Sequence, residues 1–293
     1  MQDSELKYLV SLFDDDDEVV TETVNRRIIE KGDSVMSGII TYLNKEEDPQ
    51  MKKAILQRMV YLNTGFKIAA LKQFIENQHD DVSLFEGSYI ISSLLDVGLD
   101  KEIYEHKFLT CSIEYMSESS SDRTAIENVR IFNHIFYTRL HFSTCDTFIT
   151  AERHALIDSV LKSRKGNPIA VAFIYFMLAQ AGGLPIYPLC FPGGFVPVYI
   201  ENGKELFYIN IFKNGEIFLE DRLKNFLTDQ GLEYDRSKFK VKDEMAIFVI
   251  YMESLQFLYS SKGQTQMVSI IEKALGCFGD ERYLSVDIDE EQE

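Results

Sequence analysis

Cysteine and histidine are the residues of this chain whose chemistry could support catalysis or metal binding. The four cysteines are Cys111, Cys145, Cys190 and Cys277, and no two of them form a CxxC pair. That spacing favours neither a zinc site nor a framework of disulfide bonds. All five histidines lie at or before His154. Because no HExxH, Walker or GxGxxG motif is present, the sequence predicts no metal, nucleotide or other cofactor.

The charge of the chain limits its partners. It has 30 basic and 47 acidic residues, a formal charge of −17. Nucleic acids and anionic membrane surfaces attract positive charge, so we expect neither as a partner. The acidic runs at 14–18 and 287–293 are predicted to be solvated ends rather than calcium sites, since they lack the spaced ligands and the turn glycine of a calcium loop. A protein or a peptide is the expected partner.

Length and composition indicate a soluble protein of about two domains. The chain has 293 residues, 45% of them hydrophobic, which is enough for substantial cores. The first residues, MQDSELKYLV, do not have the pattern of a secretory signal. The longest apolar run, 168–179, is shorter than the ~20 residues that a membrane span needs. We therefore expect a cytoplasmic protein.

A buried helix is the strongest structural signal. Asn167 is a good N-cap, and Pro168 suits the first helical turn, where no amide donor is needed. The residues that follow, up to Ala181, are apolar nearly all round, which predicts a helix enclosed by the rest of the domain. Gly182 and Gly183 are expected to end it.

Strands are predicted directly after this helix. Asn202-Gly203 and Asn214-Gly215 have the residue types of tight hairpin turns, in which both residues take a positive φ. The last three strands should therefore form an antiparallel meander beside the buried helix, and Pro197 indicates an edge or a bulge. The expected strands are 186–191, 195–201, 205–212 and 216–219.

The N-terminal region is predicted to consist of helical hairpins. Gly32, Gly65 and Gly98 recur every 33 residues, a period found in helical repeats. This indicates HEAT-like hairpins, although an ordinary helical bundle with well-placed caps explains the pattern equally well. The expected helices are 18–30, 34–43, 49–62, 67–77, 82–96 and 101–116.

The fold class predicted for the whole chain is α+β. A serine-rich joint is followed by an amphipathic helix with Ile126 and Leu140 on one face. A second helix, from near Thr150, then leads to the buried helix. Two more helices, near 243–261 and 264–277, close the fold. The expected division is a helical-repeat-like region 1–122, a core 123–235, a helical hairpin 236–279 and an acidic tail 280–293.

Two stretches resemble a known family. VLKSRKGNPIAVAFIYFMLAQAGGLPIYPLCFPGGF, residues 160–195, resembles the core of the SirB-type transglutaminase-like proteins. SLFEGSYIISSLLDVGLDKEIYEHK, residues 83–107, resembles their N-terminal helical part, and the closing hairpin resembles their tetratricopeptide-like tail. The likeness covers roughly residues 80–275. It implies a papain/transglutaminase-like core, a buried helix followed by an antiparallel sheet.

The resemblance also implies that the catalytic residues are missing. The cysteine, histidine and aspartate positions of transglutaminase-like enzymes fall on Pro168, Gly194 and Asn210. Proline and glycine supply no nucleophile and no base, and a neutral amide orients an imidazole poorly. The resemblance therefore implies a pseudoenzyme that binds a protein or peptide, or has a regulatory role. The cleft would be lined by Asn167, Tyr175, Cys190, Phe191, Gly193, Gly194 and Tyr208.

Two alternatives remain open. In the first, the chain is a cysteine hydrolase or acyltransferase whose nucleophile has moved to Cys190, with His154 or His141 as its base; this requires a thiol with a depressed pKa. In the second, the chain is a structural scaffold with a filled cleft. Tyrosine and phenylalanine side chains packed into the cleft would favour the scaffold over an open binding cleft.

Overall fold

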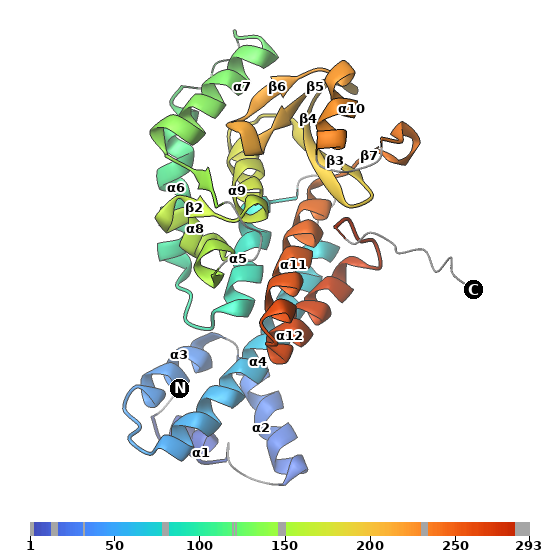
Figure 1. Cartoon of the computed structure of the whole chain (residues 1–293). Helices are drawn as coiled ribbons and strands as arrows, with labels where there is room; N and C mark the ends of the chain where they lie inside the picture. The colour runs from blue at the N-terminus through green and yellow to red at the C-terminus, as the bar shows by residue number, and fades with distance from the viewer. Residues whose placement is uncertain are drawn as a thin grey trace, which may run out of the picture.

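A computed structural model describes residues 3–12, 17–31, 33–77, 82–118, 120, 122–145, 151–229 and 234–284 (Figure 1). The acidic run at 287–293, most of the run at 14–18, and Gly32 lie outside the described residues. The described part is predominantly helical with one larger sheet, so the predicted α+β class is confirmed. In this part of the chain, no helix has both the length and the apolar character to cross a membrane.

The first four helices enclose a small core of their own. They are α1 (Asp3–Ser11), α2 (Glu18–Lys31), α3 (Asp33–Leu43) and α4 (Pro49–Glu76). Figure 1 shows this group at one end of the molecule, with α4 running from it toward the remaining helices. The buried apolar residues of this core are Leu9, Val10, Val24, Ile28, Val35, Ile39, Ile55, Met59 and Leu62.

Helix α4 corrects one prediction. The two helices expected at 49–62 and 67–77 form a single helix of 28 residues that passes through Gly65. Asp48 caps its start by accepting a hydrogen bond from the Gln50 N–H at 2.9 Å, and Pro49 occupies the first turn. The break predicted at Gly65 was therefore wrong. A glycine inside a helix costs only about 1 kcal/mol relative to alanine, which is too little to end the helix here.

The next helices along the chain lead toward the buried helix expected after Asn167. Helices α5 (Leu84–Leu95) and α6 (Lys101–Met116) confirm the helices expected there. The helix expected over 126–140 is α7 (Ala125–Asn133), which continues as one π-helical segment, η1 (His134–Arg139). A short 3-10 turn, η2 (Glu152–His154), and α8 (Ile157–Ser163) follow.

Helix α9 (Pro168–Ala181) is the buried helix predicted from the sequence. The Asn167 side chain caps it by accepting a hydrogen bond from the Ala170 N–H at 2.7 Å. Every residue from Ile169 to Ala179 is buried, because other elements cover the helix on all sides. Because α9 lies at the centre of the main core, the elements that pack against it determine where a functional site can form.

The main sheet has five antiparallel strands in the order β6-β5-β4-β3-β7. The predicted hairpin turns are present: Asn202, Gly203, Asn214 and Gly215 all have positive φ. Pro197 does not mark an edge, since it lies in the central strand β4 opposite Pro188, and the bulge comes between Tyr199 and Ile200. The strands are β3 (Ile186–Phe191), β4 (Gly194–Glu201), β5 (Lys204–Asn210), β6 (Glu216–Phe218) and β7 (Lys240–Val241).

Two features of the sheets were not predicted. Strand β7 adds to the edge of β3, and a short parallel pair joins β1 (Ser143–Thr144) to β2 (Lys165–Gly166) directly before α9. Each strand of these additions is only two residues long. Such short strands have too few residues to show the alternating pattern that identifies a strand.

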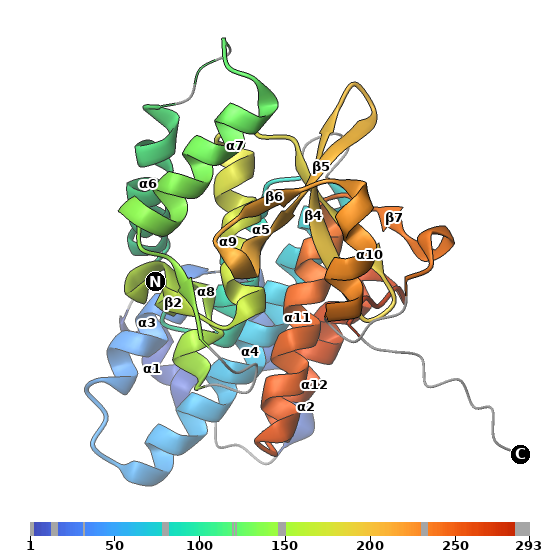
Figure 2. The same ribbon diagram turned by 45° about the horizontal axis from the view of Figure 1, so that its top comes forward.

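Each face of the main sheet packs against a different helix. Helix α9 covers one face and α10 (Glu220–Asp229) covers the other, as Figure 2 shows. Helix α11 (Glu244–Ser261) lies against α9 and pairs with α12 (Thr265–Leu275), which confirms the predicted C-terminal hairpin. The α9 face carries Cys190, Phe195, Tyr199, Phe207 and Ile209. The α10 face carries Leu189, Phe191, Val196, Val198, Tyr208 and Phe218.

Candidate functional site

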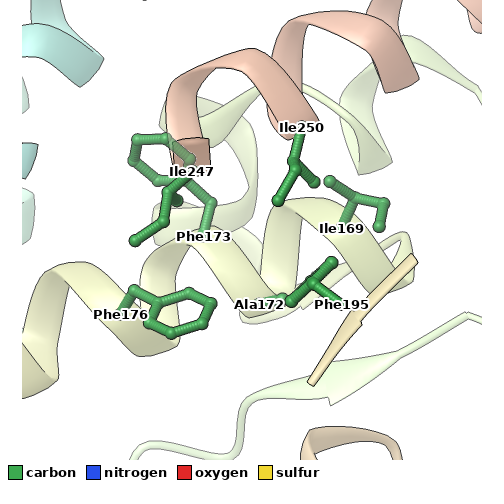
Figure 3. Close-up of a pocket in the computed structure, with 7 residues that line it drawn as sticks. All are labelled: Ile169, Ala172, Phe173, Phe176, Phe195, Ile247 and Ile250. Carbon is green, nitrogen blue, oxygen red and sulfur yellow. The ribbon is translucent and has the colours of Figure 1, made fainter. Parts of the chain in front are cut away.

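The candidate site is the junction where the first half of α9 meets strand β4. Helix α11 covers this junction from the other side, so three elements converge on it (Figure 3). Phe195 of β4 points toward α9, and its ring lies 6.0 Å from that of Phe176. The side chains that line the junction are all apolar: Ile169, Ala172, Phe173, Phe176, Phe195, Ile247 and Ile250.

The space left at this junction is very small. The cavity has a volume of about 10 Å³, which is close to the minimum that holds one water molecule. A buried water also needs polar partners, and these seven side chains offer none. The rings of Phe173 and Phe248 lie 5.6 Å apart, which closes the junction toward α11. A peptide or an acyl group therefore has no room there.

The three predicted triad positions do not meet at this junction. Pro168 is half-buried at the start of α9, one turn before Ala172 and thus on the same side of the helix. Gly194 pairs with Phe191, whose side chain packs on the α10 face. Since paired residues point to the same face of a sheet, position 194 faces away from α9.

Asn210 has a local structural role at the end of β5. It lies two residues after Tyr208, which places it on the α10 face of the strand. Its side chain is buried and accepts a hydrogen bond from the Phe212 N–H at 3.1 Å, which turns the chain into the next segment. The strand positions next to Gly194 and Asn210 that face α9 are Phe195 and Ile209, and both carry apolar side chains.

The other predicted cleft residues are dispersed. Asn167 is 2% exposed and caps α9, while Phe191 and Tyr208 lie on the α10 face; Gly193 forms the turn between β3 and β4 with φ of 84°. Tyr175 is fully buried and donates a hydrogen bond to Asn133 Oδ1 at 2.6 Å. The structure does not bring these residues together around one opening.

Tyr175 belongs to a buried polar network that holds the sheet against the helices. Asn133 donates from Nδ2 to the Gly215 carbonyl at 2.7 Å while its Oδ1 accepts from Tyr175. Tyr137, in the π-helical segment, donates to the Ile211 carbonyl at 2.8 Å. Burial raises the pKa of both tyrosines, so they stay protonated donors at neutral pH. The network joins three distant parts of the chain.

Cys190 is poorly suited to nucleophilic chemistry. It lies on the α9 face of β3, opposite Phe195, and is only 4% exposed. Burial raises the pKa of its thiol to about 12, and the positive charge of Lys242 offsets this only in part. The nucleophilic form of cysteine is the thiolate, so a thiol in these surroundings is expected to be inert.

His154 has a different cysteine partner from the one considered in the sequence. Its Nδ1 lies 3.4 Å from Cys145 Sγ, beside the start of α9. Sequence reasoning missed this pair because nine positions separate the two residues and the short β1–β2 pairing that brings Cys145 to β2 was not recognised. His141 is exposed and has a φ of 60°. In the described residues, no three His, Cys, Asp or Glu side chains form a group that could hold a metal ion.

Comparison with known proteins shows which proteins this chain is similar to. Residues 104–249 match the family described as the transglutaminase-like superfamily. A UPF0162 protein of Buchnera aphidicola subsp. Acyrthosiphon pisum is 26% identical over 167 residues, which cover 54% of this chain and 60% of that protein. A UPF0162 protein of Vibrio cholerae is 32% identical over 96 residues, covering 33% of this chain and 35% of that protein. No solved structure matches significantly.

The matched segment coincides with the elements that build the site. It begins in α6 and ends in α11, so it contains α9, all five strands of the main sheet and α10. The matched parts span less than two thirds of either curated relative. A buried helix followed by an antiparallel sheet is also the arrangement that the sequence predicted. Residues 104–249 of this chain thus form a transglutaminase-like superfamily domain.

Proposed function

We propose that this chain is a non-catalytic transglutaminase-like protein of the SirB type that acts by binding another protein. The observation that carries the proposal is the packed junction between α9 and β4, where Ile169, Phe195 and Ile247 meet. Acyl transfer needs a nucleophile, a base and room for a substrate. The side chains at the junction supply neither of the two groups, and the cavity there is about 10 Å³.

The packed junction also favours a closed cleft over an open one. Peptide binding at the start of α9 would require Phe195 and the α11 side chains to move out of a close-packed core, which costs about 1.5–3 kcal/mol for each large side chain exposed. We therefore propose that the binding surface lies on the outside of the molecule.

Helix α6 offers such a surface. Leu109, Ile113 and Met116 are 43%, 60% and 56% exposed and lie on one side of the helix, because they are spaced by four and three residues. Glu102 and Glu105 continue the same side toward the start of the helix, and both are exposed. Figures 1 and 2 both show α6 at the outer edge of the molecule, on the side away from α11 and α12.

This exposed face of α6 indicates the chemistry of its partner. Its apolar end would accept apolar side chains, and its acidic end would attract lysine or arginine. The charge of −17 on the whole chain adds to the attraction for a basic segment. We commit to a partner protein that offers an amphipathic helix with basic residues at one end.

A photo-crosslinking experiment tests the binding. A photoreactive residue placed at Ile113 should capture the partner from a native lysate, whereas one placed at Phe257, which is exposed to a similar degree on α11, should not. The peptide joined to position 113 should contain lysine or arginine and helical apolar spacing. The Glu105→Lys variant should reduce the capture. Equal capture at both positions, or capture that Glu105→Lys leaves unchanged, would overturn the proposed surface.

An activity assay tests the absence of catalysis. Purified protein is incubated with a glutamine-containing peptide and an amine, and the transfer product is measured by mass spectrometry. We expect no product above the level without protein. Turnover that disappears in the Cys190→Ala variant would overturn the non-catalytic assignment and support the relocated nucleophile instead.

A further inference from the structure

The start of α9 carries a thiol–imidazole pair that the proposed function does not use. The Cys145 N–H donates to the Gly166 carbonyl at 2.8 Å, and the Asn167 N–H donates to the His154 carbonyl at 2.6 Å. Both segments are therefore fixed to the residues that lead into α9. Cys145 Sγ and His154 Nδ1 lie 3.4 Å apart, and both side chains are half-buried rather than enclosed.

The hydrogen bonds of the imidazole determine its role. Arg153 Nε donates to His154 Nε2 at 3.2 Å, so Nε2 is the acceptor nitrogen. In a neutral imidazole the other nitrogen then carries the hydrogen, and Nδ1 donates toward Cys145 Sγ. Desolvation, together with the charges of Arg153 and Lys165, lowers the pKa of His154, which keeps the ring neutral at pH 7. His154 is thus a hydrogen-bond donor to the sulfur rather than its base.

Two other uses of the pair fit less well. A metal ion would need further ligands, yet no third candidate joins the pair in the part of the chain that the structure describes, and the two neighbouring cations, Arg153 and Lys165, would repel it. Acyl transfer needs a base with a free lone pair facing the thiol, and Nδ1 carries a hydrogen instead. A hydrogen-bond donor that faces a half-buried sulfur suits a reaction in which the sulfur attacks as an anion.

We propose that Cys145 and His154 form a modification site that takes small hydroperoxides, with Cys145 oxidised to a sulfenic acid. The thiol proton leaves to solvent, and the sulfur then attacks the terminal oxygen of the peroxide. The S–O bond forms as the O–O bond breaks, so sulfur loses two electrons and the peroxide gains two. The leaving hydroxide or alkoxide takes a proton from water. His154 Nδ1 remains the donor that holds the sulfur anion before the attack.

The other cysteines provide internal controls. Cys111 and Cys190 are buried, so a peroxide reaches neither easily. Cys277 is half-buried like Cys145, but its Sγ contacts the carbonyl oxygen of Lys273 at 3.4 Å instead of an imidazole. A difference between Cys145 and Cys277 therefore measures the surroundings of the sulfur rather than its exposure alone.

The test uses hydrogen peroxide as the oxidant and a diketone probe that reacts with sulfenic acids. The full-length protein is treated with dilute peroxide in the presence of the probe, and each cysteine is quantified by mass spectrometry. Cys145 should be labelled at least about tenfold faster than Cys277, since His154 Nδ1 faces the sulfur of Cys145 and no imidazole faces that of Cys277. His154→Ala should reduce that ratio to near one. His154→Asn, whose amide can donate from nearly the same position, should restore part of it.

Two results would overturn the proposal. One is equal labelling of Cys145 and Cys277 in the unchanged protein. The other is a His154→Ala variant whose far-UV circular dichroism is unchanged and whose Cys145 labelling is as fast as before. The readout is the chemical state of one sulfur, so it stands or fails independently of partner binding by α6.

Discussion

Two Asn-Gly turns of nearly identical geometry allow the buried polar network to be tested by a single methyl group. Asn214 and Gly215 have φ of 52° and 73°, and Asn202 and Gly203 have φ of 51° and 72°. A Cβ added at Gly203 would meet no atom within 4 Å. A Cβ added at Gly215 would lie 2.3 Å from Cγ and Oδ1 of Asn133. The alanine variants differ, therefore, mainly in what they do to Asn133.

The expected losses can be estimated from these contacts. Alanine in the left-handed region costs about 1 kcal/mol at either turn. At Gly215, Asn133 must also move, which breaks its hydrogen bonds to Tyr175 Oη and the Gly215 carbonyl. Each buried polar group left unpaired costs about 1–3 kcal/mol. We expect Gly203→Ala to lose about 1 kcal/mol of unfolding free energy and Gly215→Ala about 3–5 kcal/mol.

Urea unfolding followed by far-UV circular dichroism measures this difference, because the chain has no tryptophan to report by fluorescence. With an m-value of about 2–3 kcal/mol per molar urea, the two midpoints should differ by about 1 M. Equal shifts of the midpoint for Gly203→Ala and Gly215→Ala would refute the reasoning. They would show that the turn conformation, and not the contact with Asn133, determines the cost.

Three further predictions follow from the same structure. Tyr175→Phe should lower the unfolding free energy by about 1–3 kcal/mol, measured by urea denaturation, because Asn133 Oδ1 loses its buried donor; no change would contradict the network. Burial raises the pKa of Cys190 from 9.0 to about 12, so its neutral form is favoured in the folded state and stability should fall as pH rises between these values. Cys190→Ala should flatten that part of the pH profile, and a profile unaltered by the substitution would show that other groups cause it. Arg236→Ala should lower the unfolding free energy by about 1 kcal/mol in low salt and by less in 1 M salt, since Arg236 Nη2 contacts both Glu205 oxygens at 2.7 and 2.6 Å. Lys238→Ala is the control: its ion pair with Asp235 is 4.0 Å long and more exposed, so this variant should lose no measurable stability.

The central part of the fold could be predicted because its local signals agree with its packing. Asn167 and Pro168 start α9, the uninterrupted apolar run predicts its burial, and the two Asn-Gly pairs locate the hairpin turns. At α4 a local signal misled, since Gly65 matched a spacing that suggested a helix end but packing continues the helix through it. The division of the chain at 122, 235 and 279 stays a prediction.

The candidate site was less predictable because it depends on which face each side chain takes. A shift of one residue along a strand moves a side chain to the opposite face of the sheet. The resemblance places the histidine and aspartate positions of the enzymes on Gly194 and Asn210, but the strand pairing shows that Phe195 and Ile209 face α9. The Cys145–His154 pair was hidden for a related reason, since the two-residue strand beside Cys145 leaves no recognisable pattern.

Helix α4 gives the two cores a common mechanical element. Its first half supplies Ile55 and Met59 to the N-terminal core, and its second half supplies Leu71 and Phe74 to the main core. At 1.5 Å per residue the 28 residues form a rod of about 42 Å. A force applied to the N-terminal helices would therefore reach the main core as a torque. Helix α4 would transmit it by bending rather than by sliding. Gly65 lies near the middle of the rod and has no side chain, and a Cβ added there would meet no atom within 4 Å, so we expect the rod to bend most easily at this residue.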